Sequence, residues 1–124
     1  MGEIVVMETI KFTFNWNKKL ETDNFTTIRL ENPYKYKVGE VYNILQVDKG
    51  RTLDRGQGKI IELCTIKLHH LKKINCILDT GYGLNETKDI IYKMYPGKDW
   101  SKQELYYMLI RKVKQTNTTG NLFE

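Results

Sequence analysis

Thr27 and Arg29 are the first residues of this sequence whose types and spacing could do chemistry. They stand two positions apart in the β-branched run 25–29, so a strand places both side chains on one face. A threonine hydroxyl becomes a nucleophile when a base activates it. An arginine presents a planar fork of donors that fits a phosphate group or a base edge. The alternative for Arg29 is an internal salt bridge to Glu31 or Glu62.

Tyrosine and lysine alternate over residues 34–37. Tyr34 can stack on an unpaired base while Lys35 and Lys37 contact the phosphates beside it. The alternative is a solvated edge loop whose tyrosines cover one end of the fold. The pattern therefore predicts either a nucleic-acid contact or an aromatic cap.

Two further segments carry groups that suit anions or bases. Arg51 and Arg55 lie in the glycine-rich stretch 48–58, which we expect to be a loop able to clamp a phosphate, although it lacks the pattern of a P-loop. Tyr82 stands between two glycines directly before a predicted helix, where the backbone can approach a ligand closely. Tyr82 is therefore a second candidate for stacking, and a tight connection into the helix is the alternative.

Composition limits the class of protein. The chain has 124 residues, which indicates a single domain over 1–124 with its core at about 9–113. The net charge of +5 favours a polyanionic partner, but it also suits an ordinary soluble surface. No apolar run approaches the roughly 20 residues of a membrane span, and the N-terminus lacks the pattern of a signal peptide. We expect a cytoplasmic protein that does not contact a membrane.

The two cysteines do not indicate a disulfide framework or a metal site. Besides Cys64 and Cys76, only His69 and His70 could join a zinc site, and neighbouring residues of a strand point to opposite faces. Unpaired thiols fit a reducing compartment. We therefore expect no metal and no cofactor.

Strand patterns dominate the chain. We expect strands over residues 9–16, 26–30, 40–47, 59–68 and 104–113. In the first strand the alternation places one set of residues on a common face: Ile10, Phe12, Phe14 and Trp16. In the fourth strand the alternation slips, which predicts a bulge. The polar ends of the chain are expected to be mobile.

Two helical segments are expected between these strands. Residues 17–24 predict one short helical turn. The main helix begins near Leu84 with Asn85 as its cap, and it stops at Pro96 and Gly97. Its buried stripe is expected to hold Ile90, Ile91 and Met94. Many short strands with one main helix and a short second helix predict an α+β fold, mainly β, built as a small β-barrel.

Three motifs in this order resemble the ASCH domain of the PUA-like superfamily. They are the T-x-R strand at Thr27 and Arg29, the K-x-G-E-V turn over residues 37–41, and the Y-P-G helix end at Tyr95. The resemblance covers about residues 9–113 and is closest to the small bacterial acetylcytidine amidohydrolases. It implies a PUA-like barrel and a ligand that is RNA, another nucleic acid or a modified nucleoside.

The chain departs from that group at the residues thought to form its catalytic set. The threonine of the set maps to Thr27, but the lysine position holds Asn24, which can contact a ligand and cannot act as a base. The glutamate position falls near Thr80, with Asp79 beside it as a replacement shifted by one residue. Lys18 or Lys19 could reach in from the preceding segment to replace the lysine.

Three functions remain open from the sequence. The favoured one is a module that binds RNA or another nucleic acid through a basic cleft, without amidohydrolase activity, because the motif lysine is missing. The second is a hydrolase acting on a modified nucleoside, or a ribonuclease, with Thr27 as its catalytic residue. The third is a phage or mobile-element factor that binds a protein partner and exposes an apolar patch.

Overall fold

A computed structural model describes residues 7–13 and 15–114 of the chain, which form an α+β fold that is mainly β. The elements follow one another as β1 (Thr9–Phe12), η1 (Trp16–Glu21), β2 (Asn24–Leu30), β3 (Val41–Asp48), β4 (Arg51–Lys67), η2 (Leu68–His70), α1 (Lys73–Thr80), α2 (Leu84–Met94) and β5 (Glu104–Val113). Here η marks a 3-10 helix.

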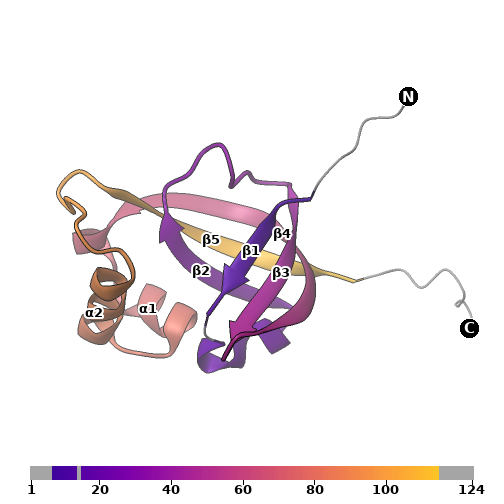
Figure 1. The fold of residues 1–124 in the computed structure, drawn as a ribbon. Helices are drawn as coiled ribbons and strands as arrows, with labels where there is room; N and C mark the ends of the chain where they lie inside the picture. Colours follow the sequence, from indigo (N-terminus) through magenta and orange to yellow (C-terminus); the bar gives the residue numbers. More distant parts are fainter. Residues whose placement is uncertain (1–6, 14, 115–124) are drawn as a thin grey trace, which may run out of the picture.

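The five strands form one sheet in the order β1-β3-β4-β5-β2. β1 pairs with β3 in parallel, and the other neighbours are antiparallel. The sheet curls into a half-barrel, and α1 and α2 lie together on one side of it, at the left of Figure 1. This placement of the helices matters because it brings them beside β2.

The main core brings together side chains from all five strands, as expected for the inner face of a curled sheet. Tyr42, Ile44 and Ile60 are fully buried there. Gly58 lies against this core so closely that a Cβ atom would stand 2.5 Å from the Ile110 methyl carbon. A side chain at this position would overpack the core.

A second cluster lies where the helices meet the sheet. It contains Leu68, Leu71, Cys76, Ile91 and Leu105, with partly buried residues of β2 and α2 around them. Leu105 is thus buried on the opposite face of β5 from Met108 and Ile110, which belong to the main core. The helices are held to the sheet through this second cluster.

Helix α1 presents an apolar stripe to solvent. Ile74, Ile77 and Leu78 are exposed at the i, i+3 and i+4 spacing of one helical face. The face turned toward the protein carries Cys76 and Asp79. This helix therefore buries its small and charged side chains and exposes its large aliphatic ones.

The predicted loop over residues 48–58 is wrong, because most of it belongs to the 17-residue strand β4. Lys49 and Gly50 both have positive φ, 50° and 79°, which is the two-residue turn that suits a β-hairpin. The β3–β4 register slips between Asn43 and Leu45, near Gly56 with φ of 86°. A bulge accommodates this glycine within the strand.

Several other predictions are confirmed. β5 covers residues 104–113 as expected, and the short helical turn appears as η1. The predicted bulge in the fourth strand is present, since the β4–β5 register slips between Ile60 and Glu62. The first strand ends at Phe12, which is earlier than predicted.

The helices differ from expectation in three ways. α1 was not expected at all. The cap of α2 is Gly83 and makes no side-chain hydrogen bond, so the assignment of Asn85 as the cap is wrong. Met94 is exposed, whereas Ile91 is buried and Ile90 is half-buried.

Some expectations fall outside the described residues. These are the mobile ends at residues 1–6 and 115–124, Phe14, and the side chain of Trp16. Among the described helices, none has the length and apolar character to cross a bilayer.

Candidate functional site

A pocket of about 120 Å³ opens where η1, β2, α1 and α2 meet. Its lining residues are Lys11, Phe12, Thr13, Lys19, Thr27, Ile28, Arg29, Asp79, Thr80, Thr87, Ile90, Ile91, Met94 and Tyr95. The volume corresponds to about four water molecules at liquid density and lies below the usual range for drug-sized ligands. Only a small group, or one end of a larger molecule, fits inside.

The geometry of η1 decides which of its two neighbouring lysines enters the pocket. The Asn15 side chain accepts a hydrogen bond of 2.8 Å from the Leu20 N–H, and Leu20 is fully buried as the anchor of the turn. Lys18 has a positive φ of 50° and stays exposed. Lys19 is turned inward and is 4% exposed.

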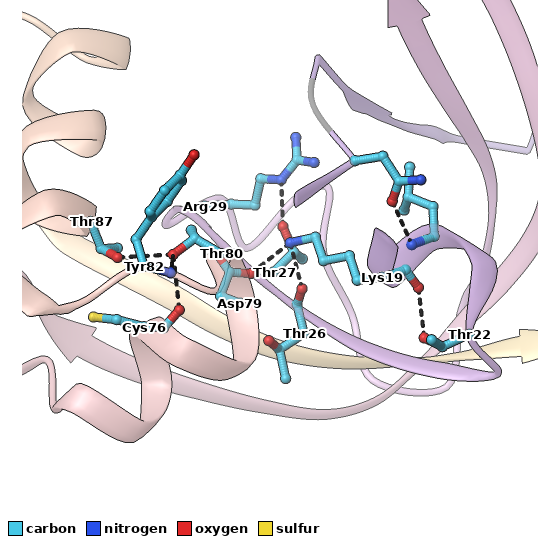
Figure 2. A network of polar contacts seen from close by, with 12 residues as sticks. Lys19, Thr22, Thr26, Thr27, Arg29, Cys76, Asp79, Thr80, Tyr82 and Thr87 are labelled. Atoms are coloured by element: carbon cyan, nitrogen blue, oxygen red, sulfur yellow. Dashed lines mark hydrogen bonds and ion pairs between the residues drawn. The ribbon is translucent and has the colours of Figure 1, made fainter. Parts of the chain in front are cut away.

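Lys19 forms a buried ion pair with Asp79. Its Nζ atom lies 2.7 Å from Asp79 Oδ1 and 2.8 Å from the Thr26 carbonyl oxygen, to which it also donates (Figure 2). Thr26 immediately precedes Thr27 in β2, so the ammonium is tied to the strand that carries the candidate hydroxyl. This is the one salt bridge within the ranges 7–13 and 15–114.

Burial dominates the electrostatics of this pair. It lowers the pKa of Lys19, although Asp79 opposes the change, and the nearby charge of Arg29 lowers it further. Burial also raises the pKa of Asp79 against the opposing effect of Lys19 and Arg29. A lysine with a lowered pKa can lose its proton nearer to neutral pH, and a general base needs this property.

Asp79 reaches the pocket because α1 packs against η1 and β2. The helix ends at Gly81, whose φ of 81° provides the left-handed cap of the last turn. The next side chain, Thr80, bonds to the Thr87 hydroxyl at 3.0 Å and accepts from the Tyr82 N–H at 3.0 Å. These contacts join α1 to α2 beside the pocket (Figure 2).

Arg29 supplies a cation without a carboxylate. Its Nε atom donates to Thr27 Oγ1 at 3.0 Å, and its guanidinium lies 4.5 Å from the centre of the Phe12 ring. In the described part of the chain it makes no salt bridge, so the internal pair with Glu31 or Glu62 is absent. The rest of the guanidinium fork is free to bind a carbonyl oxygen or an anion.

Phe12 and Tyr95 are among the pocket residues that were not identified as site residues from the sequence. Phe12 has both cations over its ring, with Lys19 Nζ at 5.4 Å, and it packs edge-on against Phe25. Tyr95 lines the pocket, and burial raises the pKa of its phenol while Arg29 opposes the change. The Y-P-G motif contained Tyr95 and was the only sequence signal for it, whereas nothing beyond strand alternation marked Phe12.

The pocket brings together Thr27 and Arg29 with two of the residues considered as replacements in the catalytic set, Lys19 and Asp79. The other predicted residues do not line the pocket, although the Tyr82 N–H bonds to Thr80 at its edge. These residues are Asn24, Tyr34, Lys35, Lys37, Arg51, Arg55 and Tyr82. Asn24 accepts a hydrogen bond of 3.3 Å from Arg111, and Arg55 donates twice to Gln46. These residues do not form one basic cleft with Arg29.

The two histidines do not lie on a strand as the sequence predicted. His69 and His70 lie in η2, where their rings are 4.1 Å apart, so the expectation of opposite faces is wrong. Cys64 is exposed and Cys76 is buried, and neither forms a disulfide with the other. In residues 7–13 and 15–114, no three of the potential metal-binding side chains gather into a cluster.

No protein-family model, curated protein or solved structure matches this chain.

Proposed function

We propose that this protein is a small hydrolase that removes an acyl group from the amino group of a modified nucleoside. The observation that carries the proposal is the buried Lys19–Asp79 pair in the same pocket as Thr27 and Arg29. At the position of the motif lysine this sequence has Asn24. Lys19, which belongs to η1, places a buried ammonium group in the pocket instead. The resemblance to the acetylcytidine amidohydrolases suggests the acyl-amide substrate.

Thr27 is the nucleophile in this proposal. Its oxygen attacks the carbonyl carbon of the acyl amide, and its proton passes to the neutral form of Lys19. The resulting oxyanion is stabilised by the free donors of Arg29. When the intermediate collapses, the C–N bond breaks and the leaving amine takes the proton from Lys19. Asp79 keeps the Lys19 side chain in position.

Water completes the cycle. A water molecule attacks the threonyl ester while Lys19 accepts its proton. The C–O bond to Thr27 then breaks and Lys19 returns the proton to the Thr27 oxygen, so the products are a free carboxylic acid, the Thr27 hydroxyl and neutral Lys19. The pocket volume supports a small acyl group and one ring edge as the part of the substrate that enters. Ile90, Ile91 and Phe12 offer the apolar surface against which a planar base can pack.

The experiment is incubation of the purified protein with acetylcytidine, followed by chromatography of the released cytidine. We expect turnover that is lost in Thr27→Val and in Lys19→Met. Two matched controls should retain it: Lys18→Met removes the neighbouring exposed lysine, and Thr65→Val changes an exposed threonine in β4. Absence of turnover on all acylated nucleosides, or cleavage of RNA instead, would overturn the proposal.

A further inference from the structure

A second concave surface, here called the groove, lies on β4 and β5 and has a volume of about 410 Å³. It is lined by Val38, Gly39, Lys59, Ile60, Ile61, Arg111, Lys112 and Val113. It shares none of its lining residues with the pocket. The groove is also shallower and more open than the pocket, so it can accept a chain that runs across it.

Three cations line the groove without carboxylate partners. Lys59 and Arg111 are directly paired across β4 and β5 and share one face, whereas Lys112, the next residue along β5, points to the other face. None of the three makes a salt bridge to any residue in the described ranges. Arg111 has only a neutral contact, from its Nε to the Asn24 side-chain oxygen at 3.3 Å. Lys59 and Arg111 are therefore not held in ion pairs within the described residues and are available to an anion.

The surface between these cations is apolar and irregular. Val38 is 60% exposed at the turn that leads into Gly39. Ile61 lies at the bulge where the β4–β5 register slips. A bulge leaves its extra residue unpaired and bends the strand locally. Cations beside apolar surface suit a ligand with alternating phosphates and rings.

The loop over residues 34–37 leads directly into one wall of the groove. It is fixed by the buried Tyr42, whose hydroxyl donates to the Lys35 carbonyl at 2.7 Å and accepts from the Lys37 N–H at 2.8 Å. Tyr34 nevertheless remains 91% exposed. A large aromatic ring is thus presented to solvent on an anchored backbone, four residues before Val38.

We propose that the groove binds a single-stranded nucleic acid, with Lys59 and Arg111 on its phosphates and Tyr34 stacked on an unpaired base. Single strands are favoured over duplexes because an exposed ring can stack only on a base that has left its own helix. This inference goes beyond the hydrolase activity and does not depend on it. Arg111 pairs with Asn24 and shares its face of the sheet. Asn24 stands three residues before Thr27 on β2, so Arg111 and Thr27 lie on opposite faces.

The test is fluorescence anisotropy with labelled RNA and DNA strands of roughly 12 nucleotides, and with a duplex of the same length. The double variant Lys59→Glu/Arg111→Glu should weaken single-strand binding at least about tenfold. The control Lys93→Glu/Lys102→Glu changes the net charge equally at exposed positions outside the groove. Tyr34→Ala, which changes no charge, should weaken binding as well.

Equal loss in the groove and control variants would overturn the proposal, because net charge alone would then explain binding. Absence of binding, or a preference for the duplex, would overturn it too. Lys59→Gln/Arg111→Gln provides a milder variant if the charge reversal prevents folding. Thr27→Val should leave strand binding unchanged, and the groove variants should leave acetylcytidine turnover unchanged, so failure of either proposal is seen separately.

Discussion

The pocket and the groove hold the same kinds of cation in opposite settings. In the pocket, Lys19 is buried and bonded to a carboxylate, and Arg29 lies over the Phe12 ring. In the groove, Lys59 is exposed and has no salt bridge to the residues that the structure describes. Each region thus uses a different property of a positive side chain.

Burial is what separates the two regions. A desolvated lysine has a shifted pKa and a fixed position, which are the requirements of proton transfer. An exposed lysine keeps its charge and its freedom, which suits attraction of a polyanion with little specificity of geometry. The comparison therefore predicts chemistry in the pocket and only binding in the groove.

The largest effect is expected when the buried pair is broken. Asp79→Ala leaves the Lys19 amine buried without its carboxylate partner, which should lower the free energy of unfolding by about 3–5 kcal/mol. Chemical denaturation measures this. Asp89→Ala, at an exposed position of α2, should change stability by less than about 0.5 kcal/mol.

A second variant separates loss of the pair from loss of volume. Lys19→Met/Asp79→Leu removes both charges and should recover most of the stability lost in Asp79→Ala. Equal destabilisation of the single and double variants would show that packing, and not the unpaired ammonium, sets the cost.

Removal of the Arg29 guanidinium should affect the pocket alone. Arg29→Gln removes the donors available to an oxyanion, and kcat should fall by about 100- to 1000-fold. Steady-state hydrolysis of acetylcytidine checks this. Strand binding by the same variant should be unchanged, and a parallel loss of both would contradict the separation of the two regions.

The next largest difference between the pocket and the groove is expected in how salt concentration affects hydrolysis and strand binding. Two neutralised phosphates on a single strand give a slope near −1.4 in log K against log salt, so affinity should fall roughly 7-fold between about 50 and 200 mM salt. The rate constant for hydrolysis should change little, because buried charges are weakly screened. Titrations and rate measurements at both salt concentrations make the comparison.

The smallest effect is a shift of the pH–rate profile. Because the pKa of Lys19 is lowered, its neutral form appears at lower pH than for a free lysine, so activity should rise with pH and reach half its maximum below 10.5. Arg29 contributes to this lowering, and Arg29→Gln should therefore move the ascending limb to higher pH. Normalised profiles of kcat/KM measure the shift, and an unmoved limb would exclude Lys19 as the base.

Much of the sheet was predictable because apolar and polar residues alternate along a strand that buries one face. The alternation predicted β5 to its ends, and its slip over Ile60, Leu63 and Ile66 predicted the bulge that lies between Ile60 and Glu62. The strand start at Arg51 was missed because glycines normally mark loops, and here a turn and a bulge absorb them. Helix α1 was missed because its large aliphatic side chains face solvent, which reverses the usual pattern.

The site was predictable only where its residues are neighbours in sequence. Thr27 and Arg29 share one strand face, and the period of the strand puts them together. Lys19 and Asp79 are 60 positions apart, and only the packing of α1 against η1 brings them into contact. The sequence offered Lys18 and Lys19 equally, and the choice between them depends on the positive φ of Lys18.

Because of helix α1, the assembled pocket is expected to persist for a shorter time than the folded sheet. Helices as short as its eight residues are unstable alone, and this one buries few large side chains. Local opening of α1 would cost less than global unfolding, as is common for segments with little apolar burial. Since Asp79 lies on α1, each opening removes the partner of Lys19 while the half-barrel stays folded. Amide hydrogen exchange in α1 therefore reports the fraction of time for which the pocket is assembled.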